Sequence, residues 1–332
     1  MKKYRLLNFG IKVNRELEEC EKSHICHKAA DILRRKYPYL SWDYLNILTD
    51  LFNTKMYVVE DKNEVSLVNY IYQNKSIYFS DKKDLRKVDE QVIHECIHKL
   101  QDKRSKHGRL MQLGNCEFTL SKVKGLAFNE AAVQYIVSEL FDKDYKEIDV
   151  NTIKLKLPNK PYYSVITNLM KQIMILIGQN ELLVKSTLQA NNDFNYKMID
   201  YFGEKEFYEI RDKFDKIAEL QIKNSREILK EKYLYLQNFI AESFFRRELK
   251  YVDSMSEIDN LKMKLNECFG FIESSMQSKE YNETYKILLG AILYKEDEIK
   301  NKYALTVIKG GNIKKIFGRI KSIIGLGSSN EY

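Results

Sequence analysis

The sequence predicts an α+β fold that is mostly α-helical, with a small antiparallel sheet in the first third of the chain. Three observations support this prediction. The 332 residues include only three prolines and thirteen glycines, too few for an all-β fold with many tight turns. β-branched and aromatic residues concentrate between residues 55 and 80. From residue 164 onward, apolar residues recur three and four positions apart, as in Ile210, Phe214 and Ile217.

Helices are expected on both sides of the sheet. Residues 16–35 predict an amphipathic helix that Tyr37-Pro38 ends, and Ser41 can cap a second helix. After the sheet, Asp81 or Asp84 is expected to start a third helix. Later helices are predicted to begin at residue 128 or 129 and to end at residue 140, and to cover residues 166–177, 181–190, 196–201, 206–251 and 256–299.

Strands are expected at residues 55–60, 65–73 and 76–80, and Asn74-Lys75 joins the last two as a hairpin turn. The changes in composition divide the chain into three parts. These are a sheet-containing core at residues 1–160, a helical domain at 161–305 and a basic tail at 306–332.

The composition indicates a globular protein of the cytoplasm. The net charge of +8 is spread along the chain, so no nucleic-acid partner is expected. The five cysteines are odd in number and irregularly spaced, which favours reduced thiols. The N-terminal residues are too polar for a signal peptide, and no apolar stretch is long enough to cross a membrane.

The stretch His94-Glu95-Cys96-Ile97-His98 carries the strongest chemical signal. On a helix the two histidines share a face, so their imidazoles can bind one zinc ion at about 2.0–2.1 Å. Glu95 is rotated by roughly 100° and can act as general base on a metal-bound water. Cys96 faces away and is expected to pack as a small apolar residue. The alternative is a surface helix that binds no metal.

A second motif supplies a third ligand. A catalytic zinc ion needs three protein ligands and one open position. Glu130 in Asn129-Glu130-Ala131 could be the third, because small residues after it let its helix approach the first one closely. The two motifs together resemble those of the gluzincin, or thermolysin-like, zinc metallopeptidases. This resemblance covers about residues 65–140 and implies a zincin-like core, in which a small antiparallel sheet packs on both ligand helices.

The chain departs from the family pattern at Gln134. The pattern often has an aspartate four residues after the ligand glutamate, where it orients the first histidine. Gln134 shares a helical face with Glu130, and its amide oxygen could accept the ring N–H of His94. Gln134, and with it Asn129, is expected to lie beside the ligands and to support them without binding the ion. The insertion between His98 and Glu130 is longer than in the family.

The hairpin before the zinc helix resembles the family's substrate-binding edge strand. The resemblance implies that Asn69 helps to hold the substrate peptide. An exposed edge strand also offers unpaired N–H and C=O groups to an extended chain. The alternative is an ordinary hairpin that covers the core.

A peptidase of this kind usually has a second donor for the oxyanion. No histidine follows His107, so a tyrosine is expected, and Tyr162 and Tyr163 are the candidates. Both could instead be packing residues. A second metal site at Cys20, His24 and His27, which share a helical face, is disfavoured because no further ligand completes it.

The C-terminal part has several candidate roles. Residues 313–324 form a basic amphipathic segment that can lie on a membrane surface or contact a protein, unless it packs on the protein's own helices. The long helices could recognise substrate, form a homodimer or act as a scaffold.

Taken together, the motifs predict a cytoplasmic zinc-dependent peptidase acting on a peptide or protein substrate. Glu95 activates a water bound to an ion held by His94, His98 and Glu130. Two alternatives stay open. One is a regulatory protease that cuts a repressor-like partner, and the other is a non-catalytic helical interaction protein that contains zinc.

Overall fold

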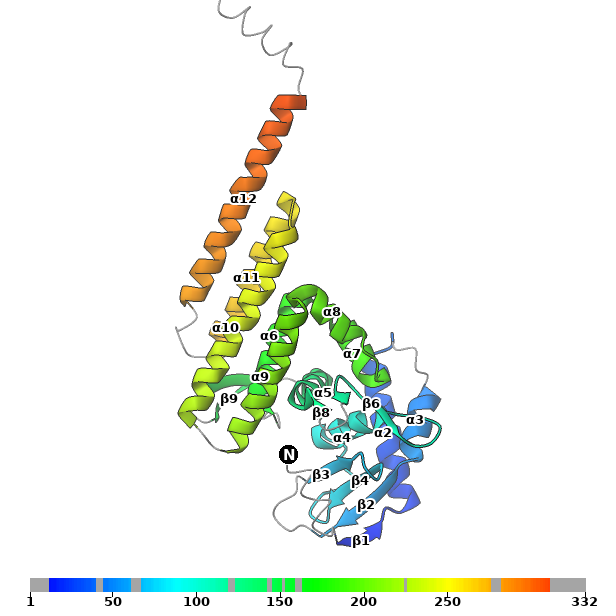
Figure 1. Cartoon of the computed structure of the whole chain (residues 1–332). Coiled ribbons are helices and arrows are strands. Elements are labelled where there is room, and N and C mark those ends of the chain that lie inside the picture. Colours follow the sequence, from blue (N-terminus) through cyan, green and yellow to red (C-terminus); the bar gives the residue numbers. More distant parts are fainter. Residues whose placement is uncertain are drawn as a thin grey trace, which may run out of the picture.

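The computed structural model describes residues 12–39, 44–60, 67–118, 123–141, 145–150, 153–158, 163–223, 226–275 and 282–310. Figure 1 shows a part with the main sheet, in blue and cyan, beside a larger set of helices in green, yellow and orange. The helices are α2 (Glu19–Lys36), α3 (Tyr44–Phe52), α4 (Glu90–Leu100), α5 (Leu126–Leu140), α6 (Ser164–Ile177), α7 (Asn180–Gln189), α8 (Asp193–Phe202), α9 (Glu204–Ile222), α10 (Arg226–Tyr251), α11 (Met255–Ser275) and α12 (Asn282–Gly310). The prediction of an α+β fold that is mostly α is confirmed.

The strands are β1 (Val13–Glu16), β2 (Lys55–Val59), β3 (Val68–Ile71), β4 (Ser76–Ser80), β5 (Asp102–Arg104), β6 (Leu110–Leu113), β7 (Glu117–Phe118), β8 (Val123–Lys124), β9 (Tyr145–Val150) and β10 (Ile153–Pro158). The main sheet has the order β1-β2-β4-β3, so β3 is an edge strand. β3 and β4 form the expected hairpin. The sheet is not wholly antiparallel, because β2 pairs with β4 in parallel. The chain passes from β2 to the outer strand β3 and then returns into β4.

Helix α4 packs against the edge strand β3. It begins at Glu90, later than the expected start at Asp81 or Asp84. Asp84 instead closes a turn by accepting from the backbone N–H of Arg86. The cap of α4 is Asp89, whose side chain accepts from Val92 N. An aspartate at this position satisfies an N–H group that has no partner within the helix.

Helix α5 lies at the centre of the molecule and packs on α4, α6, α7 and α9. Every residue from 127 to 137 is buried, which is the property of a helix covered on all sides. It starts at Leu126, two residues before the expected start at 128, because its first turn is capped from a distance. The carboxylate of Asp215 on α9 accepts from Gly125 N at 3.0 Å and from Ala127 N at 2.8 Å.

The C-terminal helices continue the same hydrophobic core. The main cluster of buried apolar side chains runs from Leu17 to Ile299. Phe128 of α5 contacts three aromatic rings of α8 and α9, at centroid distances of 5.3–6.3 Å: Phe194, Phe207 and Phe214. Figure 1 shows α10, α11 and α12 side by side, extending away from the main sheet.

Two features of this region differ from the sequence-based expectation. The single helix expected over residues 206–251 is two helices in the structure. Helix α9 ends at Ile222, and α10 begins at Arg226. The antiparallel pair of β9 and β10 was not anticipated. The described part contains no helix that is both long and apolar enough to cross a membrane. The basic segment at residues 313–324 lies outside the described residues.

Candidate metal centre

The two histidines of the His-Glu-x-x-His motif project from one face of α4. Their ring centroids are 4.7 Å apart and their Nε2 atoms are 3.0 Å apart. The flanking apolar residues Val92, Ile93 and Ile97 are buried, so the helix is anchored on its other sides. A spacing of four residues on a packed helix therefore brings the two imidazoles together.

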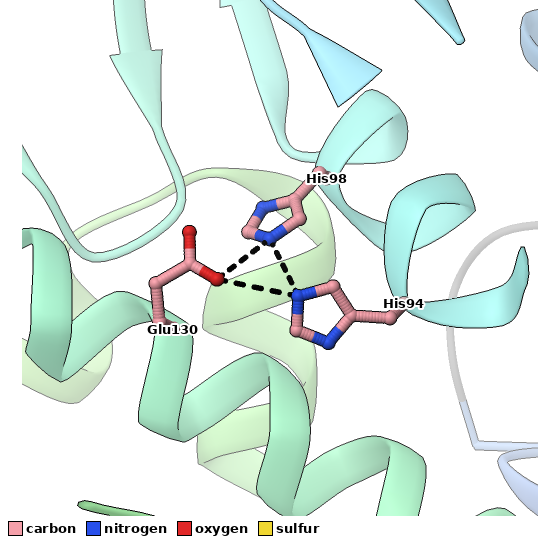
Figure 2. Close-up of side chains that lie close together, drawn as sticks. All are labelled: His94, His98 and Glu130. Carbon is pink, nitrogen blue, oxygen red and sulfur yellow. Dashed lines mark hydrogen bonds and ion pairs between the residues drawn. The ribbon is translucent and has the colours of Figure 1, made fainter. Parts of the chain in front are cut away.

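Glu130 of α5 faces both histidines (Figure 2). Its Oε2 atom lies 3.2 Å from Nε2 of His94 and 3.2 Å from Nε2 of His98. This is the one group of three or more histidine, cysteine or acidic side chains, among the residues described, that could hold a metal ion. The exposed fractions of the three residues are only 5%, 3% and 7%.

The chemistry of this group fits a divalent ion such as zinc. Nδ1 of His94 lies 3.1 Å from the amide oxygen Oε1 of Gln134. An oxygen acceptor at that position fixes the hydrogen on Nδ1 and leaves a lone pair on Nε2, which points at the carboxylate of Glu130. Two acceptors at hydrogen-bond distance are compatible with a cation held between them.

The distances also fit a tetrahedral ion. Ligand atoms about 2.0–2.1 Å from such an ion lie about 3.3–3.4 Å from one another. The three atoms of the group are separated by 3.0–3.2 Å. Three protein ligands leave one position for water or substrate.

Glu95 lies next to the edge strand. It is 6% exposed, and its Oε2 accepts from the backbone N–H of Tyr70 at 2.6 Å. The backbone N–H and C=O groups of successive residues in β3 point alternately toward β4 and toward the outer edge of the sheet. The C=O of Leu67 points toward β4, because it accepts from Ser80 N. The N–H and C=O groups of Tyr70 therefore point to the outer edge of the sheet, where Glu95 is.

The remaining predicted site residues occupy different places. Asn129 is fully buried, and its Oδ1 accepts from Asn115 N at 2.9 Å. Asn69 is 5% exposed and lies in β3. Tyr163 precedes α6, with its ring centroid 6.3 Å from that of His94. Tyr162 lies outside the described residues.

The other candidate ligands are engaged elsewhere. Cys96 is fully buried, and burial raises the pKa of its thiol well above the usual range, so it stays uncharged. His24 Nε2 lies 3.0 Å from Arg86 O, and His27 Nδ1 lies 2.6 Å from the Tyr44 hydroxyl. Cys20 is exposed and does not join them in a metal-binding group.

Sequence reasoning missed two residues that support the ligands. Gln101 follows α4 and places its side-chain amide nitrogen 2.6 Å from Nδ1 of His98. Its spacing of three residues from His98 was a usable signal, because residues three apart on a helix are neighbours. Asp215, which caps the helix of Glu130, is 85 positions further along the chain, and no local pattern indicates it.

Comparisons with family models, curated proteins and solved structures found no match. The fold and the site define a mostly helical α+β protein with a buried His-His-Glu group suited to a metal ion.

Proposed function

We propose that the protein is a zinc-dependent peptidase in which His94, His98 and Glu130 hold the ion. The observation that carries this proposal is the convergence of three ligand atoms within 3.2 Å of one another, from two helices far apart in sequence. In the part of the chain described, no fourth histidine, cysteine or acidic side chain joins the group. Three ligands and one open position are typical of catalytic zinc, whereas structural zinc usually has four protein ligands.

The bound ion would supply a Lewis acid that polarises the scissile carbonyl and the attacking water. Glu95 takes the proton of that water and passes it to the leaving nitrogen. The backbone N–H of Tyr70 donates to the Glu95 carboxylate and holds it at the sheet edge. Tyr163, whose ring lies beside His94, is the proposed second donor to the oxyanion.

The substrate is proposed to bind as an extended chain along β3. The outer edge of that strand carries the C=O of Tyr70, while the N–H of the same residue is engaged by the general base Glu95. Backbone pairing there would place a peptide carbonyl near the ion without demanding a particular side chain. Asn69 is the proposed side-chain contact to the peptide. The cytoplasm is the proposed setting, since the five cysteines are thiols outside any disulfide.

The first test is metal analysis of purified protein. Wild type should carry one zinc ion per chain, and His94→Ala should lose it. His107→Ala is the matched control, because this histidine is exposed in the loop between β5 and β6. A wild-type protein that takes up no zinc would overturn the proposal.

The second test is cleavage of a proteome-derived peptide library, read by mass spectrometry. Glu95→Gln should keep zinc and lose cleavage, whereas Glu90→Gln, at the start of the same helix, should keep both. Loss of zinc from Glu95→Gln would contradict the assigned role.

A non-catalytic protein with structural zinc is the second candidate. The observation that favours it is the low exposure of the three ligands, 3–7%. Stoichiometric zinc in wild type, together with no difference between wild type and Glu95→Gln on the library, would support this candidate instead.

A further inference from the structure

Gln101 contacts His98, the second histidine of the candidate metal centre. It follows the last residue of α4, and its backbone N–H still donates to Ile97 O. Its side chain is completely buried, and its amide nitrogen Nε2 lies 2.6 Å from Nδ1 of His98. A polar side chain with no exposed surface and so short a contact to a ligand histidine is placed to control that histidine.

The surroundings of Gln101 decide which end of its amide faces His98. Oε1 of Gln101 has no hydrogen-bond partner. A Cβ added to Gly114 would lie 2.1 Å from this oxygen and 2.2 Å from Oδ1 of Asn129, so the two amide oxygens are close neighbours. Two amide oxygens that face one another repel. The two ends of an amide are assigned from the hydrogen bonds they make. A half-turn of the amide puts its N–H group against Asn129 and its oxygen against His98.

The chemistry of metal binding requires the same orientation. For Nε2 of His98 to present a lone pair toward an ion, its Nδ1 must carry the hydrogen and donate it. Of the two ends of the Gln101 amide, only the oxygen can accept that hydrogen.

Asn129 is held in place by the segment between β6 and β7. Its Oδ1 accepts from the backbone N–H of Asn115, and Asn115 donates from Nδ2 to Thr187 Oγ1 at 3.0 Å. Asn129, Asn115 and Thr187 are all fully buried. Gly114 lets the two amides approach so closely, because it has no side chain and adopts φ +51°.

We propose that Gln101 is a positioning residue for His98. Its Oε1 accepts the Nδ1–H of His98, its N–H group donates to Asn129, and Nε2 of His98 is thereby presented to the ion. This inference rests on the proposed metal site. It gives each histidine ligand its own glutamine, Gln134 for His94 and Gln101 for His98, so both partners are neutral amides.

The test compares Gln101→Ala and Gln101→Glu with wild type in a zinc competition titration against a chromophoric chelator. Gln101→Ala should weaken zinc binding about 10- to 100-fold. Gln101→Glu should recover only part of this loss, because its carboxylate accepts the same hydrogen from His98 but sets a second oxygen against Oδ1 of Asn129. Gln172→Ala is the matched control. Gln172 is also fully buried, but it donates to Gln237 O in the helical region. The Gln172→Ala variant should bind zinc with an affinity within about twofold of wild type.

A second readout needs no metal. Long-range ¹H–¹⁵N spectra of the metal-free protein distinguish the two tautomers of each histidine. His98 should carry its hydrogen on Nδ1 in wild type, and should lose this fixed tautomer in Gln101→Ala.

The outcomes separate this inference from the proposed function. A wild type that binds zinc, with equal affinities for Gln101→Ala and Gln172→Ala, would overturn the role of Gln101 alone. An Nε2–H tautomer of His98 in metal-free wild type would also overturn it. A wild type that binds no zinc would overturn the proposed function, while an Nδ1–H tautomer that depends on Gln101 would still support the hydrogen bond.

Discussion

Replacing Gly114 by alanine should destabilise the protein more than the same change at Gly178. Both glycines adopt a left-handed conformation, with φ +51° and +63°. An alanine in that conformation costs about 1–2 kcal/mol at either site. At Gly178 nothing lies within 4 Å of the added Cβ, so strain is the whole cost. At Gly114 the Cβ would lie 2.1 Å from the end of the Gln101 amide that faces Asn129, and 2.2 Å from Asn129 Oδ1.

The steric contribution at Gly114 can be estimated from the burial of its neighbours. Gln101 and Asn129 are both fully buried, so their amides cannot swing into solvent to make room. Overpacking of a buried site costs about 1–3 kcal/mol. Gly114→Ala should therefore lower the free energy of unfolding by about 2–5 kcal/mol, against about 1–2 kcal/mol for Gly178→Ala.

The measurement is urea unfolding of the metal-free proteins, with the midpoint and the slope fitted separately. Metal-free protein is used so that a change in zinc affinity does not add to the difference. Losses that agree within about 0.5 kcal/mol for the two variants would refute the reasoning, because strain alone would then explain both.

Three further predictions follow from the site and its supports. Gln134→Glu should tighten zinc binding about tenfold, because a carboxylate makes the histidine it contacts a more basic ligand; an unchanged affinity in a competition titration would contradict this. Asp215→Ala should lower the free energy of unfolding by about 1–2 kcal/mol through loss of the α5 cap. Asp212→Ala, exposed on the same helix, should change it by less than about 0.5 kcal/mol, and equal losses in urea unfolding would exclude the capping role. In the native protein only Cys20 should react quickly with a thiol reagent at mildly alkaline pH. Burial raises the pKa of Cys26 to about 12, and the other three cysteines are also buried. Fast reaction of more than one thiol before unfolding would count against this packing.

The parts of the fold and site that sequence reasoning anticipated depend on local spacing. The helical pair His94 and His98 and the strong helical signal around Glu130 are carried by residues within a few positions of one another. The sequence alone did not show that the two helices pack together. The small residues Ala131 and Ala132 made a close approach possible, and the resemblance of the two motifs to a known family supported it.

The parts that were missed depend on distant residues or on weak patterns. The cap from Asp215 makes α5 begin earlier in the chain than expected, and no residue near position 126 predicts this. The parallel pairing of β2 with β4 arises because the chain passes β4's position to form the outer strand β3 first. The β-propensity of the residues does not determine that order. The pair of β9 and β10 did leave a signal. Ile153 and Leu155 are buried and Lys154 and Lys156 are exposed, which is the alternation of a half-buried strand.

The remote cap on α5 connects the helix that carries Glu130 to the C-terminal helices. Asp215 belongs to α9, yet it holds the first turn of the helix that carries Glu130. Thermodynamic coupling of this kind is reciprocal. If an ion at the proposed site favours the capped position of α5, whatever stabilises that position would raise the affinity for the ion, and the ion would slow amide exchange at Gly125 and Ala127. A molecule that binds the exposed side of α9 could thus regulate the site without approaching it.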